Sequence, residues 1–178
     1  MKNNLTEKYI KTINKWAEKY GIKELKINDK EKIFNLKQLC IFNTNIKYIP
    51  AAIFKLTNLK SLSIYCNNLN RLPKEICNLI NLKELYIHCE NLKSLPNEIE
   101  RLTNLESIHI ECENLKQLPK EIHNLIKLKR FDIDCPNSEN FPDGIAKLIN
   151  LETIYIINSN GKLNLQYLIG GIVKLNNL

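Results

Sequence analysis

The chain has 178 residues, of which 44% are hydrophobic and 25% charged, and its formal net charge is +7. This length and composition suit one ordinary domain or one elongated repeat array, and they exclude a globally disordered chain. No apolar stretch approaches the roughly 20 residues that cross a bilayer, and no apolar run follows the charged first residues. We therefore expect a cytoplasmic protein without a membrane span or a secretory signal.

The first predicted element is an amphipathic helix over residues 5–20. Apolar residues recur there every three or four positions and share one face: Leu5, Tyr9, Ile13, Trp16 and Tyr20. Gly21 follows as a stop signal. Ile22, Leu25 and Ile27 then repeat the spacing of the later strand residues, which predicts a shortened first repeat that joins the sheet. We interpret residues 1–35 as a helix and degenerate repeat that cap the array, although a basic amphipathic helix could also bind a membrane or an acidic partner.

A 23-residue repeat occupies residues 36–160. Leucine begins each of six units: Leu36, Leu59, Leu82, Leu105, Leu128 and Leu151. Position 4 is always apolar, position 6 is isoleucine in all six units, and position 15 is proline in the first five. The alternation of positions 4 and 6 predicts a short half-buried strand. The three- and four-residue spacing of positions 14–21, next to proline, predicts a short helix or 3₁₀ turn.

The repeat pattern L-x-x-L-x-I-x-C-x-N-L-x-x-L-P-x-x-I-x-x-L-x-N resembles the leucine-rich repeat family, and its 23-residue form is similar to the intracellular Ras-suppressor type. The resemblance implies an α/β leucine-rich repeat solenoid, with a curved parallel β-sheet on the concave face and short helices or 3₁₀ turns on the convex face. One unit cannot bury its own apolar edge, so neighbouring units must stack. We expect residues 161–178 to form an irregular last repeat with an open edge.

Two columns of polar residues accompany the apolar pattern. Asparagine fills position 10 in all six units: Asn45, Asn68, Asn91, Asn114, Asn137 and Asn160. Cysteine fills position 8 in four of them: Cys66, Cys89, Cys112 and Cys135. We expect the cysteines to face inward as a reduced, buried ladder, and the asparagine amides to satisfy backbone groups at the bend. No C-x-x-C pair occurs, so the spacing gives no support for a zinc site.

The concave face collects the candidate partner-binding residues. Positions 3, 5, 7 and 9 are expected to point outward, and in the middle of the array they carry six carboxylates against one arginine. The candidates are Tyr65, Glu84, Tyr86, His88, Glu90, His109, Glu111, Glu113, Arg130, Asp132, Asp134 and Tyr155. An acidic face flanked by aromatic residues favours a basic protein segment and repels nucleic-acid phosphates.

Two histidines on this face raise the question of a metal. His88 and His109 lie one repeat apart, beside the carboxylates of Glu111, Asp132 and Asp134. Such a set could hold a divalent ion or respond to pH. Flat sheet faces rarely converge ligands, so we predict no metal site and no cofactor.

We found no signature of an enzyme. The sequence has no phosphate-binding loop and no strained nucleophile turn, and the array with its caps uses nearly all of its length. We therefore predict a non-enzymatic protein–protein interaction module, without a small-molecule substrate. One alternative is a self-associating scaffold that forms a homodimer through its open C-terminal edge. Another is nucleic-acid or membrane binding by the Lys-rich convex side, where basic residues recur: Lys74, Arg101, Lys120 and Lys147.

Overall fold

The computed structural model describes residues 6–26, 29–138, 145 and 147–157. Three short elements come first: α1 (Glu7–Tyr20), the 3₁₀ helix η1 (Lys23–Leu25) and α2 (Lys30–Phe34). The strands are β1 (Gln38–Phe42), β2 (Ser61–Tyr65), β3 (Glu84–His88), β4 (Ser107–Glu111), β5 (Arg130–Asp134) and β6 (Thr153–Ile157). The 3₁₀ helices between them are η2 (Ala51–Lys55), η3 (Lys74–Asn78), η4 (Asn97–Arg101) and η5 (Lys120–Asn124).

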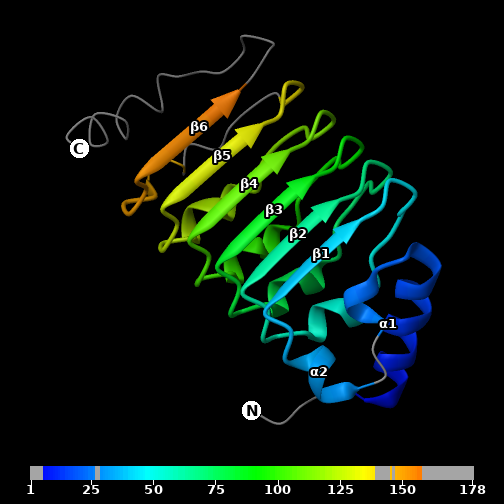
Figure 1. Cartoon of the computed structure of the whole chain (residues 1–178). Coiled ribbons are helices and arrows are strands. Elements are labelled where there is room, and N and C mark those ends of the chain that lie inside the picture. Colours follow the sequence, from blue (N-terminus) through cyan, green and yellow to red (C-terminus); the bar gives the residue numbers. More distant parts are fainter. Residues whose placement is uncertain (1–5, 27–28, 139–144, 146, 158–178) are drawn as a thin grey trace.

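The six strands form one open parallel sheet in chain order, with the 3₁₀ helices on its other side (Figure 1). Each strand pairs with the next in a register shifted by one unit, so Leu62 lies beside both Leu39 and Leu85. This register confirms the 23-residue repeat and the strand positions. The 3₁₀ helices confirm the predicted turns, and each begins directly after a proline such as Pro50 or Pro73. The architecture is therefore the expected solenoid.

The core is a stack of identical apolar layers. In the second unit, seven apolar residues are completely buried: Leu59, Leu62, Ile64, Cys66, Leu69, Ile76 and Leu79. Burial of one leucine or isoleucine side chain stabilises a fold by about 1.5–3 kcal/mol. Because each layer is covered by the layers of adjacent units, this stabilisation exists only while the units are stacked.

The N-terminal helix covers the first layers of the array. Ile13 and Trp16 of α1 are buried, and α1 packs against η1 and η2 beside the β1 edge of the sheet (Figure 1). The indole Nε1 of Trp16 donates a hydrogen bond of 3.1 Å to the backbone carbonyl of Tyr48. Gly21 ends α1 in the left-handed conformation, with φ of 73°. The predicted helix and its stop signal are confirmed, while Leu5 lies outside the described residues.

The expected strand around residues 22–27 is wrong. Ile22 and Leu25 are buried as predicted, but residues Lys23–Leu25 form η1, and the first strand in the described part of the sheet is β1. A side-chain cap starts a new helix soon afterwards, because the Asp29 carboxylate accepts hydrogen bonds from two backbone N–H groups of α2. The apolar residues Ile22 and Leu25 are thus buried by a short helical turn rather than by a strand. Ile27 lies outside the described residues.

Two columns of asparagine tie each unit to the one before it. At position 10, Asn68 donates to the carbonyl of Thr44 at 2.7 Å and Asn114 to that of Glu90 at 2.9 Å, which confirms the predicted role at these two positions. The second column, at position 23, was not assigned a role from the sequence. Its members each donate to the position-22 carbonyl of the preceding unit: Asn58, Asn81, Asn104 and Asn150.

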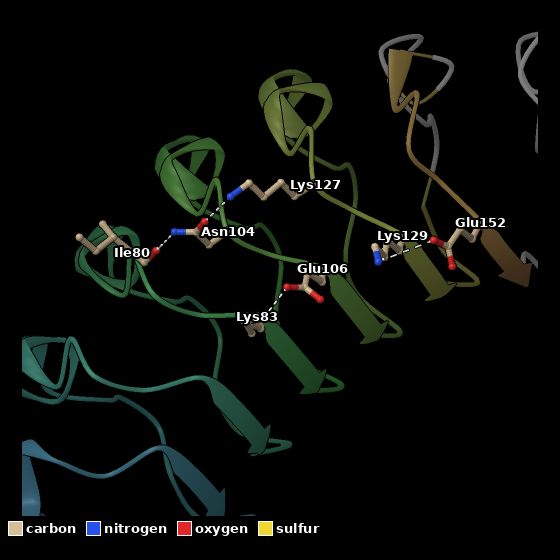
Figure 2. A network of polar contacts seen from close by, with 7 residues as sticks. All are labelled: Ile80, Lys83, Asn104, Glu106, Lys127, Lys129 and Glu152. Carbon is tan, nitrogen blue, oxygen red and sulfur yellow. Dashed lines mark hydrogen bonds and ion pairs between the residues drawn. The ribbon is translucent and has the colours of Figure 1, made fainter.

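The fourth unit replaces the position-23 asparagine by Lys127, whose ammonium donates to the Asn104 side-chain oxygen at 2.7 Å (Figure 2). Ion pairs at position 2 run beside this column. Lys83 contacts Glu106 at 2.7 Å, and Lys129 contacts Glu152 at 3.8 Å (Figure 2). The hydrogen bond from Lys83 holds the pKa of Glu106 below its ordinary value. Solvent screens such exposed pairs, so they fix the register more than they add stability.

The cysteine ladder is buried as predicted. Each of its four members has no exposed surface, and the thiol of Cys66 lies 3.6 Å from the carbonyl oxygen of Ile41. Burial raises the pKa of Cys66 to about 11 and that of Cys89 and Cys135 to about 12. These thiols are therefore protonated and unreactive at neutral pH.

Replacing Asn81 by alanine should lower the free energy of unfolding by about 1 kcal/mol, because the Thr57 carbonyl loses its donor. Chemical denaturation measures this change. Asn97→Ala is the matched control, since Asn97 is exposed and its side chain makes no hydrogen bond in the described structure, and it should stay within about 0.5 kcal/mol of wild type. Equal losses in both variants would contradict a structural role for position 23.

Alkaline pH should destabilise the protein through the cysteine ladder. Unfolded thiols lose their protons above their ordinary pKa of 9.0, whereas folded Cys89 keeps its proton up to about pH 12. The unfolded state then binds fewer protons, so stability falls as pH rises. Between about pH 9.5 and 11, the free energy of unfolding of Cys89→Ser should fall less steeply than that of wild type, by about 1.4 kcal/mol per pH unit. Exposed Cys40→Ser should change the slope less, and identical slopes for wild type and Cys89→Ser would contradict the prediction.

Candidate binding face

The concave face is formed by the side chains at positions 3, 5 and 7 of the strands. The parallel register places equal positions side by side, so residues one unit apart become neighbours. The position-5 column is Cys40, Ser63, Tyr86, His109, Asp132 and Tyr155. The position-7 column runs from Phe42 through Tyr65, His88 and Glu111 to Asp134.

Aromatic and imidazole rings line the part of this face nearest the N-terminus. The ring centroids of Phe42 and Tyr65 are 6.1 Å apart, those of Tyr65 and His88 also 6.1 Å, and those of Tyr86 and His109 6.2 Å. Phe42 is 70% exposed, so its ring presents apolar surface to solvent. Such rings offer contact area with few rotatable bonds to immobilise.

The histidines contact carboxylates on the next strand. Nδ1 of His88 on β3 lies 2.9 Å from Oε2 of Glu111 on β4, and both side chains are partly exposed. Nδ1 of His109 on β4 lies 3.7 Å from Oδ2 of Asp132 on β5. Each histidine therefore lies close to a carboxylate of the next strand, as predicted.

Asp132 differs from the expectation that it faces solvent, because only 6% of its side chain is exposed. Arg130 precedes it by two residues on β5, so the two side chains share a face, and Nε of Arg130 donates to Oδ2 at 2.6 Å. The Asp132 carboxylate raises the pKa of the guanidinium further above its ordinary value. Oδ1 of Asp132 is buried and has no hydrogen-bond partner among the described residues. Asp132 is thus a covered and neutralised charge rather than a free carboxylate of the face.

The other predicted carboxylates are fully or partly open to solvent. Glu84 and Glu111 are exposed on the face, and Asp134 is half-buried. Glu90 and Glu113 lie in the turns after β3 and β4, at the edge of the face, and the Asn67 amide donates to Glu90. Among the described residues, Arg130 is the only lysine or arginine at positions 3, 5, 7 and 9. The acidic character of the face therefore comes from these five carboxylates.

A depression of about 420 Å³ lies in the middle of the face. Its lining includes seven of the predicted residues: Tyr65, Tyr86, His88, His109, Glu111, Arg130 and Asp132. Ile87 supplies its buried floor. The remaining predicted residues lie outside it: Glu84, Glu90, Glu113, Asp134 and the exposed Tyr155. Its walls combine aromatic, imidazole and charged groups.

Residues 6–26, 29–138, 145 and 147–157 hold no group of three or more His, Cys, Asp or Glu side chains arranged to bind a metal ion. In the same part of the chain, we found no helix with the length and hydrophobicity of a membrane span.

Comparison with known proteins identifies the repeat. Residues 74–178 match a family model described as a leucine-rich repeat region. No curated protein matches the chain. Among solved structures, the leucine-rich repeat domain of the type III effector XopL is 20% identical with a TM-score of 0.62, over 84% of this chain and 57% of that one. An internalin (inlF) from Listeria monocytogenes is 17% identical with a TM-score of 0.39, over 75% of this chain and 54% of that one. The chain thus spans a little over half the length of each.

Arg130→Met should lower the melting temperature, because it leaves the Asp132 carboxylate buried without its cationic partner. The double variant Arg130→Met/Asp132→Asn should recover part of the loss, since the buried charge is then absent. Arg101→Met is the matched control, because Arg101 is exposed and forms no ion pair with the described residues. Thermal unfolding followed by circular dichroism measures all three. An Arg130→Met variant as stable as Arg101→Met would contradict a structural role for the pair.

Proposed function

Because the chain belongs to the leucine-rich repeat family, we propose that it is a non-enzymatic interaction module that binds a basic segment of another protein on its concave face. Repeat solenoids present extended concave surfaces that serve as binding sites. The observation that carries the proposal is the concentration of solvent-facing carboxylates around the carboxyl ends of β3–β5. They are Glu90, Glu111, Glu113 and Asp134.

Charge supports a basic partner. The four carboxylates occupy positions 7 and 9, and no described residue at these positions is a lysine or arginine. Like charges grouped in this way produce a negative potential that speeds the approach of a cationic segment. The attraction is screened over about 8–10 Å at ordinary ionic strength, so it orients the partner but does not by itself give high affinity.

The aromatic rings of the concave face supply short-range contacts, which add the affinity that charge attraction alone does not give. Tyr65 and Tyr86 line the depression with exposed and partly exposed side chains, and the exposed Phe42 ring lies beside Tyr65. An arginine or lysine side chain of the partner can lie against the Tyr65 or Tyr86 ring while its charge approaches Glu111. Buried aromatic contacts of this kind dominate the binding energy of protein interfaces.

Arg130 sets the path of the partner along the face. It stands at position 3, the amino end of β5, whereas Glu111 and Asp134 stand at position 7, the carboxyl ends of β4 and β5. Its side chain is 62% exposed, and its positive charge repels a cationic segment. We therefore infer that the segment crosses the sheet along the carboxyl ends of the strands, over His88 and Glu111.

The other predicted properties remain predictions. A cytoplasmic location and the absence of enzymatic activity follow from the sequence and accompany the proposal. The alternative of a homodimer depends on residues 161–178, which lie outside the described structure. Of the four basic residues singled out on the convex side, Lys74 also lines the groove described below.

Charge reversal on the face tests the proposal directly. The triple variant Glu111→Lys/Glu113→Lys/Asp134→Lys should bind basic peptides at least tenfold more weakly than wild type, mainly through slower association. The probes are fluorescent peptides of about 12 residues that carry lysine, arginine and one aromatic residue, together with acidic peptides of equal length, titrated by fluorescence anisotropy. Wild type should bind the basic set and not the acidic set.

The matched control is Glu7→Lys/Glu18→Lys/Glu31→Lys, which makes the same change in net charge on exposed residues of α1 and α2. This control should bind the basic peptides within a few-fold of wild type, and circular dichroism should show both variants folded. Equal losses in the two triple variants would mean that overall charge, not the concave face, binds the peptides. Undiminished binding by the concave-face variant would remove this face as the site.

A further inference from the structure

A second hollow lies on the flank of the array, outside the concave face. It has a volume of about 910 Å³ and is formed where the first three units leave their strands and turn toward the 3₁₀ helices. We call it the flank groove, and its lining residues are 47–49, 70–74, 93 and 94. These residues occupy positions 12–16 of successive units, so the repeat places equivalent side chains in a row along the groove.

The flank groove is strongly basic. Lys47, Arg71, Lys74 and Lys93 line it, and no carboxylate does. All four side chains are exposed, and none forms an ion pair with the described residues. Elsewhere on the array, lysines such as Lys83 and Lys129 are paired with glutamates. The groove therefore gathers unpaired positive charge, which repels itself until an anion binds.

The framework of the groove is fixed by the core and the N-terminal cap. Ile49 and Leu72 are buried beneath it, and the backbone N–H of Lys93 donates to the carbonyl of Asn70 at 3.3 Å. Trp16 holds the backbone of Tyr48 by the hydrogen bond from its indole. The Tyr48 side chain is 54% exposed, so an aromatic ring stands beside the cations on a backbone that is held in place.

We propose that the flank groove binds single-stranded nucleic acid. Proteins that bind single strands combine a cationic groove that follows the phosphates with aromatic rings on which bases stack. Here the row of cations from three successive units supplies the first part, and Tyr48 supplies the second. Arg71 adds a planar guanidinium that can bind phosphate oxygens through two hydrogen bonds.

An acidic protein segment fits the groove less well. Protein interfaces depend on apolar residues buried in pockets, and among the groove residues Ile49 and Leu72 are already buried in the core. Tyr48 is the one exposed large apolar side chain that lines the groove. A surface with four cations and a single ring matches the polar, positively charged character of nucleic-acid interfaces. The carboxylates of the concave face would repel phosphates and confine the strand to the flank.

The probes are fluorescent oligo(dT) and oligo(U) of about 12 nucleotides, titrated by anisotropy between roughly 50 and 200 mM salt. If all four cations contact phosphates, the logarithm of the association constant should fall with the logarithm of salt concentration with a slope of about −3. Lys47→Glu/Arg71→Glu/Lys93→Glu should weaken binding at least tenfold and flatten this slope. Tyr48→Ala should weaken binding by roughly fivefold or more without changing the slope, because stacking is lost but charge is not.

The matched control is Lys11→Glu/Lys15→Glu/Lys23→Glu, an equal change in net charge at exposed residues of α1 and η1. It should bind within a few-fold of wild type. Lys47→Gln/Arg71→Gln/Lys93→Gln serves if the glutamate variant fails to fold, and it should also weaken binding. Equal losses in the groove and control variants would overturn the proposal. So would equally tight binding of an oligo-glutamate of the same charge, or of anionic phospholipid vesicles, because either shows a surface that does not select nucleic acid.

Discussion

Each 23-residue unit of this chain needs its neighbours to bury its apolar residues and to satisfy its backbone hydrogen-bonding groups. The rest of the structure depends on this contact between units. Ile64 is buried because Ile41 and Ile87 flank it at the same position of adjacent strands. The polar edges are satisfied in the same way, since Asn81 donates to a carbonyl of the preceding unit. Because one displacement relates all units, a residue type repeated along the chain becomes a column in space. Core, hydrogen-bond ladder and surface patches are all columns of this kind.

The sequence predicts the columns well, because apolar burial at positions 4 and 6 outweighs local alternatives in each of the first five units. It predicts single residues less well where one nearby contact decides the outcome. Around Leu25 the apolar spacing fits a strand, yet a 3₁₀ helix buries the same residue, and the Asp29 cap then starts another helix. The position-23 asparagines also form a pattern in the sequence, but which backbone carbonyl each amide contacts depends on how adjacent units stack.

The segregation of charge follows from the same register. Carboxylates at positions 7 and 9 of the third to fifth units gather on the concave side, while cations at positions 12, 13 and 16 of the first three units gather on the flank. The net charge of +7 therefore hides an acidic concave side and a basic flank. A chain with scattered charges of the same total would present weak, mixed potentials. Stacking instead concentrates each sign within about one Debye length of its neighbours, where it can select a partner of opposite charge.

Arg130 and Asp132 lie at surface positions of the strand, yet their ion pair also affects stability, because the Asp132 carboxylate is buried. Positions 4 and 6 point into the core and positions 3, 5 and 7 lie on the concave face, so most changes at the latter three positions should leave the fold intact. Asp132 occupies a surface position, but its carboxylate is covered, and its charge is tolerated because Arg130 donates to it from the same strand. The Arg130 side chain is therefore accessible from the concave face, whereas the Asp132 carboxylate is not. The ion pair removes one negative charge from the face and leaves the acidic surface at the carboxyl ends of β3–β5.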